Sequence, residues 1–84
     1  MTYMVKVTAT ATAENEMRYG DVLVYYIGKG GYVHDDPWIR DGWKSRRWAD
    51  AYIRGDQEWN EHYERDYHAP HLWDHEYEVV KIVS

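Results

Sequence analysis

Apolar and polar side chains alternate with a period of two along the first part of the chain. Val5, Val7 and Ala9 fall on one side of this segment, while Lys6 and Thr8 fall on the other. Such alternation, rich in β-branched residues, is typical of a strand with one face toward solvent. We therefore predict a strand over residues 3–13, in which only Met4 departs from the pattern.

A second apolar segment follows the polar cluster Glu14–Glu16, which can turn the chain into a hairpin. Residues 17–28 are densest in apolar side chains at Val22–Ile27, and a continuous run of this kind favours a central strand. The glycine-rich loop Gly28–Gly31 ends it. This loop lacks a following Lys-Ser/Thr pair and an immediately following helix, so it does not have the pattern of a phosphate-binding loop.

From Ser45, a natural helix N-cap, the apolar residues follow a helical period. A helix of about 20 residues is expected, ended by Pro70 and open to interruption at Gly55. Its aromatic stripe is expected to face the sheet and consists of Trp48, Tyr52, Trp59 and Tyr63.

Alternation returns in residues 72–83, which we predict to be a third strand. The element order is β-β-α-β, so the predicted fold is α+β: a three-stranded sheet of antiparallel type, covered on one face by one long helix that Gly55 may or may not divide. A chain of 84 residues builds a single core, so residues 1–84 are expected to form one domain.

Composition narrows the classes of function. The formal net charge of −5 disfavours a general nucleic-acid binder and is compatible with a basic protein partner. Without cysteine there is no disulfide framework and no thiolate metal site. No apolar run is long enough to span a membrane and the N-terminus lacks a signal-peptide pattern, so we expect a cytoplasmic protein without a membrane partner.

Basic and aromatic residues are interleaved at the start of the predicted helix. Cations beside Trp43 and Trp48 could contact phosphates while a ring stacks on a base. The alternative is an ordinary solvated helix face. The residues of this nucleic-acid hypothesis are Arg40, Lys44, Arg46 and Arg47.

Four of the five histidines lie in the C-terminal third of the chain. Imidazole and carboxylate groups at helical spacing can hold zinc or nickel, although the order here matches no specific metal motif. The residues of this metal hypothesis are His62, Asp66, His68, His71 and His75. No other cofactor is expected.

Nucleophilic catalysis has little support, because cysteine is absent and the two serines are Ser45, a predicted cap, and Ser84, the last residue. A small core also leaves little room for a substrate pocket. We therefore expect a protein that is not an enzyme.

Residues 42–53, Gly-Trp-Lys-Ser-Arg-Arg-Trp-Ala-Asp-Ala-Tyr-Ile, resemble the helix start of many short phage and prophage accessory proteins. The resemblance implies a small binder that blocks a host or defence protein, of which anti-CRISPR proteins are one class. It assigns no role to any single residue.

The aromatic content points in the same direction. There are five Trp and nine Tyr but no Phe, and Trp and Tyr predominate in binding hot spots. We predict a non-enzymatic protein-binding module whose contacts lie in the irregular segment before the helix, at Tyr32, Trp38 and Trp43. A nucleic-acid-associated module and a structural homodimer are the alternatives.

Overall fold

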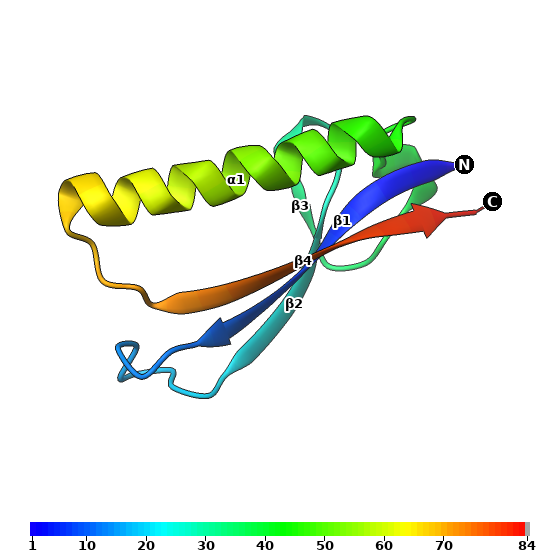
Figure 1. Ribbon diagram of the computed structural model, residues 1–84. Coiled ribbons are helices and arrows are strands. Elements are labelled where there is room, and N and C mark those ends of the chain that lie inside the picture. Colours follow the sequence, from blue (N-terminus) through cyan, green and yellow to red (C-terminus); the bar gives the residue numbers. More distant parts are fainter. Residues whose placement is uncertain (84) are drawn as a thin grey trace.

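One antiparallel sheet and one long helix make up the structure, a computed structural model that describes residues 1–83 (Figure 1). The helix α1 (Arg46–Tyr67) lies across one face of the sheet. The strand order is β3-β2-β1-β4. The strands are β1 (Thr2–Ala11), β2 (Val22–Ile27), β3 (Val33–His34) and β4 (Trp73–Ile82). The α+β prediction is confirmed, with the two-residue β3 as an addition to the three expected strands.

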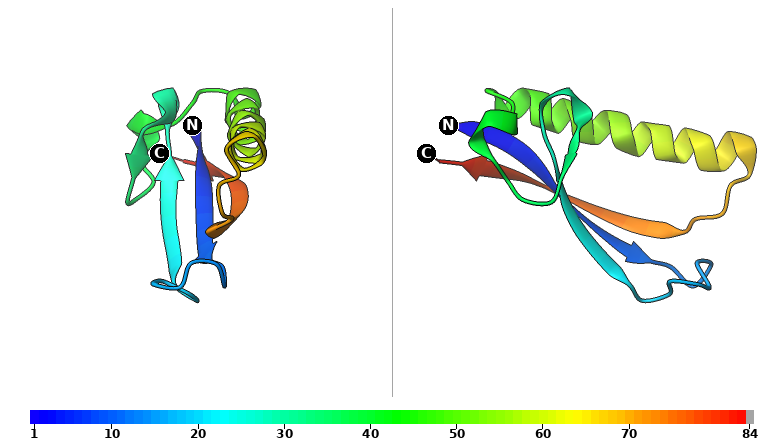
Figure 2. Two further views of the ribbon diagram at one scale, coloured as in Figure 1. Left: turned by 90° about the vertical axis from the view of Figure 1, so that its left-hand side faces the viewer. Right: turned by 180° about the vertical axis from the view of Figure 1, so that it is seen from behind.

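Strand β1 lies inside the sheet, between β2 and β4. It pairs over its whole length with β4, from Thr2 opposite Ile82 to Ala11 opposite Trp73, so the two chain ends lie side by side (Figures 1 and 2). The apolar run Val22–Ile27 is an inner strand as predicted, since β2 lies between β3 and β1, but it is not covered along its whole length. Its first three residues are exposed, because the helix lies over β1 and β4 and leaves this end of β2 uncovered (Figure 2).

The core lies between α1 and the face of β1 predicted to be apolar. Val5 and Val7 are buried there, together with Ile27 from β2 and Ala49 from the helix. Half-buried rings extend this core from the segment before the helix, from the helix, from β2 and from β4, namely Trp43, Tyr52, Tyr25 and Tyr77.

Helix α1 is continuous. The Ser45 hydroxyl accepts a hydrogen bond from the Arg47 N–H at 3.2 Å, as expected of an N-cap. The helix runs through Gly55 without interruption and ends at Tyr67, where His68 adopts a left-handed conformation with φ of 52°. A small residue at this point costs helix stability but does not break the helix when the flanking turns pack on a sheet.

The expected aromatic stripe is only partly correct. Ala49, Tyr52 and Ile53 face the sheet, whereas Trp48 is 64% exposed and Trp59 is 60% exposed. Both tryptophans lie roughly 80–100° from Ala49 around the helix axis, which places them on the helix flank. Tyr63 is also exposed, toward the end of the helix that separates from the strands in Figure 1.

The segment before the helix covers the opposite face of the sheet, at the N-terminal end of β1. The Thr2 hydroxyl donates to the Ile39 carbonyl at 2.8 Å, and the Trp38 N–H donates to the Met4 sulfur at 3.3 Å. This cover explains why Met4, the exception to the alternation, is fully buried. Among the described residues, no helix combines the length and apolar character needed to cross a bilayer.

Candidate functional site

A concave surface lies at the N-terminal end of α1, and we name it the tryptophan hollow. Its volume is about 500 Å³. Its lining combines apolar side chains with three cations and consists of Thr2, Lys29, Ile39, Arg40, Gly42, Trp43, Lys44 and Trp48. Hollows of this size that mix aromatic and charged side chains are typical places for ligand or partner contacts.

The two tryptophans of the hollow have different support. Trp43 is held by paired backbone hydrogen bonds with Tyr3, each 2.8 Å long, and its ring centroid lies 5.7 Å from that of Tyr52. Trp48 is in the first turn of α1, with a well-fixed backbone and a mostly exposed ring. The hollow therefore has one wall that is part of the core and one that is free to contact a partner.

Cations surround this end of the molecule. Lys29 belongs to a 3-10 turn (η1, Lys29–Gly31) and Arg40 to another (η2, Ile39–Asp41). Arg47 and Arg54 line a second depression beside Trp48. Within residues 1–83, no ion pair involves Lys29, Arg40, Lys44, Arg47 or Arg54. The helix N-terminus adds positive potential, so this end is basic although the protein is acidic.

The residues predicted for partner binding differ in their placement. Tyr32 and Trp38 are more than half exposed, while Trp43 is half-buried against the core. Of the basic residues predicted for nucleic acid, Arg40 and Lys44 line the hollow, Arg47 lies beside Trp48, and Arg46 contacts Asp50 at 3.8 Å.

Trp48 is the residue that sequence reasoning placed wrongly. Its spacing to Tyr52 assigned it to the core stripe, yet it forms the exposed wall of the hollow. One feature of the sequence could have indicated that Trp48 is exposed, namely the preceding Arg46-Arg47 pair. Consecutive cations indicate that the first turn of the helix is solvated.

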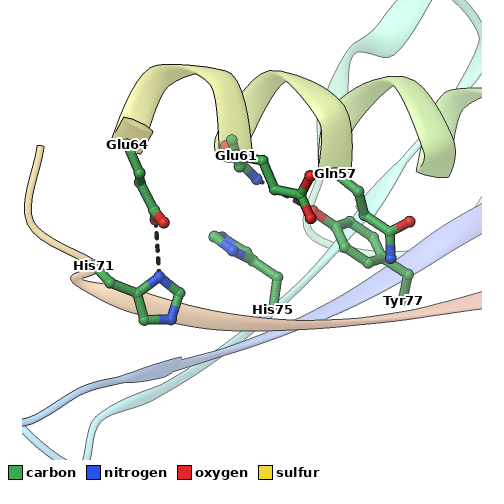
Figure 3. Close-up of a pocket in the computed structure, with 7 residues that line it drawn as sticks. Gln57, Glu61, Glu64, His71, His75 and Tyr77 are labelled. Atoms are coloured by element: carbon green, nitrogen blue, oxygen red, sulfur yellow. Dashed lines mark hydrogen bonds and ion pairs between the residues drawn. The ribbon is translucent and has the colours of Figure 1, made fainter. Parts of the chain in front are cut away.

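A second, polar hollow lies between the C-terminal half of α1 and β4, and we name it the α1–β4 cleft (Figure 3). Its volume is about 340 Å³. Its lining is Gln57, Asn60, Glu61, Glu64, His71, His75 and Tyr77. The opposite ends of the helix thus carry a basic, aromatic hollow and an acidic, histidine-containing one.

His71 connects two carboxylates at the end of this cleft. Its Nδ1 lies 2.8 Å from Glu64 Oε1 and its Nε2 lies 2.6 Å from Asp74 Oδ1 (Figure 3 shows the contact with Glu64). The hydrogen bond to Asp74, and then that to Glu64, raise the pKa of His71 above its ordinary value. The two contacts join the loop after the helix to Glu64 on α1 and to Asp74 on β4.

The five residues of the metal hypothesis do not converge. His62 Nδ1 lies 2.6 Å from Asp66 Oδ2, but Glu64 and its partner His71 are on the other side of the helix, because residues two apart on a helix point roughly 200° apart. Within the described chain there is no group of three or more His, Cys, Asp or Glu side chains that could hold a metal ion.

Asp56 of α1 lies among three tyrosines between the helix and the sheet. The pKa of each of these tyrosines is raised, mainly because its phenol is partly buried and, to a smaller extent, because it lies near the Asp56 carboxylate. The three are Tyr25, Tyr52 and Tyr77. For Tyr77 the interaction includes a hydrogen bond from the phenol to the Asp56 carboxylate. Phenols with raised pKa values stay protonated at neutral pH, so they donate hydrogen bonds and do not act as bases.

The chain matches no family model, no curated protein and no solved structure. Its function therefore has to be inferred from its own surfaces. These are the tryptophan hollow, the α1–β4 cleft and the edges of the sheet.

Proposed function

We propose that this protein is a small, non-enzymatic protein-binding module that docks its partner at the tryptophan hollow. The observation that carries the proposal is Trp48, whose ring is 64% exposed at the rim of an otherwise well-supported concave surface. Tryptophan is among the residues most enriched in binding hot spots. A large ring exposed beside a hollow makes an energetic contribution when a partner covers it.

The hollow also suggests the chemistry of the bound segment. An apolar side chain of the partner fits between Trp43 and Trp48, over Ile39. Carboxylates flanking that side chain would meet Lys29, Arg40 and Lys44, which line the hollow without ion-pair partners in the described chain. Complementary charges of this kind accelerate association and select the partner.

Two further aromatic residues extend this contact surface. Tyr32 directly follows the turn that contains Lys29, and Trp38 directly precedes the turn that contains Arg40. The backbone of Trp38 is fixed by its hydrogen bond to Met4, and its ring remains exposed. Aromatic residues on loops with a rigid scaffold are a common recognition design.

The biological setting we propose is that of a phage-type inhibitor of a host or defence protein. It rests on the resemblance of residues 42–53 to short phage and prophage proteins, together with the small size of the chain. Inhibition of this kind requires only that a partner's working surface be covered, so no catalytic group is needed.

A nucleic-acid-associated module is the second candidate, favoured by the cations around Trp48. Phosphates would meet Lys44 and Arg47 while a base stacks on the exposed ring. The two functions differ in their dependence on salt: binding to phosphates weakens steeply as salt rises, whereas binding through a buried aromatic anchor does not.

The test is affinity capture from bacterial lysate, with and without nuclease, using wild type, Trp48→Ala and Trp59→Ala. Trp59 is the matched control, because it is 60% exposed on the same helix but far from the hollow. We expect one protein to be retained after nuclease treatment by wild type and Trp59→Ala and to be lost with Trp48→Ala. Equal retention by both variants would remove the hollow from the function, and retention that nuclease abolishes would favour the nucleic-acid module.

A further inference from the structure

Strand β4 forms one edge of the sheet. It is ten residues long and pairs with β1 on one side only. The other edge of the sheet is the two-residue strand β3. An edge strand presents a row of backbone N–H and C=O groups to which another extended chain can pair, and β4 is the long edge of this sheet.

The register shows which backbone groups of β4 are free. In β1, Tyr3 and Ala11 direct their N–H and C=O groups away from β4, to Trp43 and to the turn at residues 20–21. Successive residues of a strand point these groups in opposite directions, so the even-numbered residues of β1 pair with β4. Their partners are the even-numbered residues of β4. The free groups therefore belong to Trp73, His75, Tyr77, Val79 and Lys81.

The side chains along this edge carry a row of negative charge. Asp74, Glu76 and Glu78 are exposed and share the face of the sheet opposite the helix. Across β1, Lys6 lies opposite Glu78, while Glu76 and Asp74 lie opposite threonines. Asp74 also has a basic neighbour, because its Oδ1 lies 2.6 Å from His71 Nε2. On the helix side, Glu61 and Glu64 line the α1–β4 cleft above the same strand (Figure 3).

We propose that the free edge of β4 binds an extended, basic segment of a partner protein by antiparallel strand addition. Backbone groups of the segment would pair with the five odd-numbered residues of β4, which supplies affinity, and alternate side chains would give specificity. Lys or Arg residues of the segment would lie opposite Asp74, Glu76 and Glu78, where cross-strand pairs of opposite charge are stabilising. The intervening side chains would face the α1–β4 cleft.

A second copy of this chain fits the edge less well. The two registers that pair the longest stretch of β4 with a symmetry-related copy have their two-fold axis through Tyr77 or through Glu78. The first register places Glu76 opposite Glu78 of the other copy, and the second places Glu78 opposite itself. Like charges directly opposite each other destabilise a pair of strands, so the carboxylates disfavour the two registers of self-association that pair the longest stretch of β4.

This inference rests on the proposed protein-binding function, but it concerns the other end of α1 and does not use the tryptophan hollow. The two can therefore fail separately. Loss of partner capture with Trp48→Ala tests the hollow, and binding of a synthetic strand in the absence of any natural partner tests the edge.

The probe is a capped ten-residue peptide of alternating Lys and Thr, with its binding followed by fluorescence anisotropy. Two derivatives carry backbone N-methyl groups, one on the threonines and one on the lysines. In an antiparallel addition that places Lys opposite Glu76, the threonine N–H groups point toward β4. Methylation of the threonines should therefore weaken binding at least about tenfold, and methylation of the lysines should not. A peptide that does not bind, or equal effects of both methylations, would overturn the proposal.

Protein variants give an independent readout. Replacing Glu76 and Glu78 together by Gln should weaken binding of the peptide about fivefold, whereas Glu16→Gln with Glu58→Gln, the matched removal of two exposed carboxylates elsewhere, should not. Amide exchange of Trp73, His75, Tyr77, Val79 and Lys81 should slow on binding. Unchanged exchange at these five residues, or the same loss of affinity in both variants, would show nonspecific attraction and contradict strand addition.

Discussion

Tyr77, on β4, donates a hydrogen bond from its phenol to the carboxylate of Asp56, on α1. The Asn60 amide, one turn along the helix, lies 3.5 Å from both of these groups. The three side chains form a polar joint between the helix and the sheet at the point where the hydrophobic core ends and the α1–β4 cleft begins (Figure 3 shows Tyr77 in this cleft). The joint fixes how far the helix stands from β4.

Removing the hydroxyl of Tyr77 should therefore destabilise the fold. Tyr77→Phe keeps the ring but leaves the half-buried Asp56 carboxylate only the long hydrogen bond from Asn60, and the expected loss in unfolding free energy is about 1–2 kcal/mol. Urea denaturation measures it. Tyr67→Phe is the control, because Tyr67 is exposed at the end of the helix, and its free energy of unfolding should stay within about 0.5 kcal/mol of wild type. Equal effects of the two changes would refute the role of the joint.

The three tyrosines around Asp56 should make the protein sensitive to alkali. Their pKa values are raised in the folded chain, first by burial and then by Asp56, above the value of about 10 expected in the unfolded chain. Above that pH the unfolded chain releases protons that the folded chain retains, so the stabilisation present below about pH 10 is lost as pH rises. The unfolding free energy should begin to fall at about pH 10 and should continue to fall as pH rises toward the folded pKa values.

Absorbance of tyrosinate at each pH provides the check. In the folded protein a set of tyrosines should titrate late, and this set should lose one member in Tyr77→Phe. If all tyrosines titrated together near pH 10, the structure of this cluster would be wrong.

Local pattern was sufficient to predict the strands β1 and β4 and the helix. The alternation of valines and threonines marks β1, and the capping residue Ser45 marks the start of α1. Both signals are local, since each depends on residues within a few positions of one another. Gly55 was ambiguous for the same reason: its effect depends on packing of the flanking turns, which lies outside the local pattern.

Long-range arrangement was not predictable in this way. Val22–Ile27 lies between two strands, as its composition predicts, but the helix lies over β1 and β4 and leaves the first three residues of this run exposed. The same arrangement determines which residues on the flank of the helix are buried. Trp48 and Trp59 would be covered only if the sheet extended further beneath them. The tryptophan hollow combines residues from four separate segments. The sequence identified some of its cations as candidates, but it could not show that they line one concave surface.

The ionisation of His71 is a test of the loop that joins α1 to β4. Its hydrogen bonds to Asp74 and Glu64 raise its pKa above about 6.5. Asp74 contributes most, so Asp74→Asn should lower this pKa more than Glu64→Gln does. Two-dimensional NMR titration of the imidazole signals measures each value. The reverse order, or a pKa of His71 below 6.5 in wild type, would contradict the geometry.

The same linkage gives a small effect of pH on stability. The pKa is raised by folding, so the stabilisation from charged His71 is fully present below about pH 6.5 and is lost as pH rises through the folded value. Because the side chain is almost half exposed, the effect should be below about 1 kcal/mol. The difference in unfolding free energy between wild type and His71→Ala should be larger at pH 5.5 than at pH 8, because these two conditions lie on either side of about 6.5.

Two glycines should respond to alanine in opposite directions. Gly55 lies in the middle of α1, and a Cβ added there would meet no atom within 4 Å. Gly55→Ala should therefore stabilise the protein by about 0.5–1 kcal/mol, because alanine loses less backbone entropy in a helix.

Gly42, under the tryptophan hollow, is the opposite case. A Cβ there would lie 2.5 Å from Thr2 Oγ1 and 2.6 Å from Thr2 Cβ, while Thr2 is held by its hydrogen bond to Ile39. Since the backbone at Gly42 has an ordinary φ of −88°, the cost is steric, and Gly42→Ala should destabilise by about 1–3 kcal/mol. Thermal unfolding of both variants compares them directly. A destabilised Gly55→Ala would mean that the helix is broken at this residue, and a neutral Gly42→Ala would mean that the segment before the helix does not pack on β1.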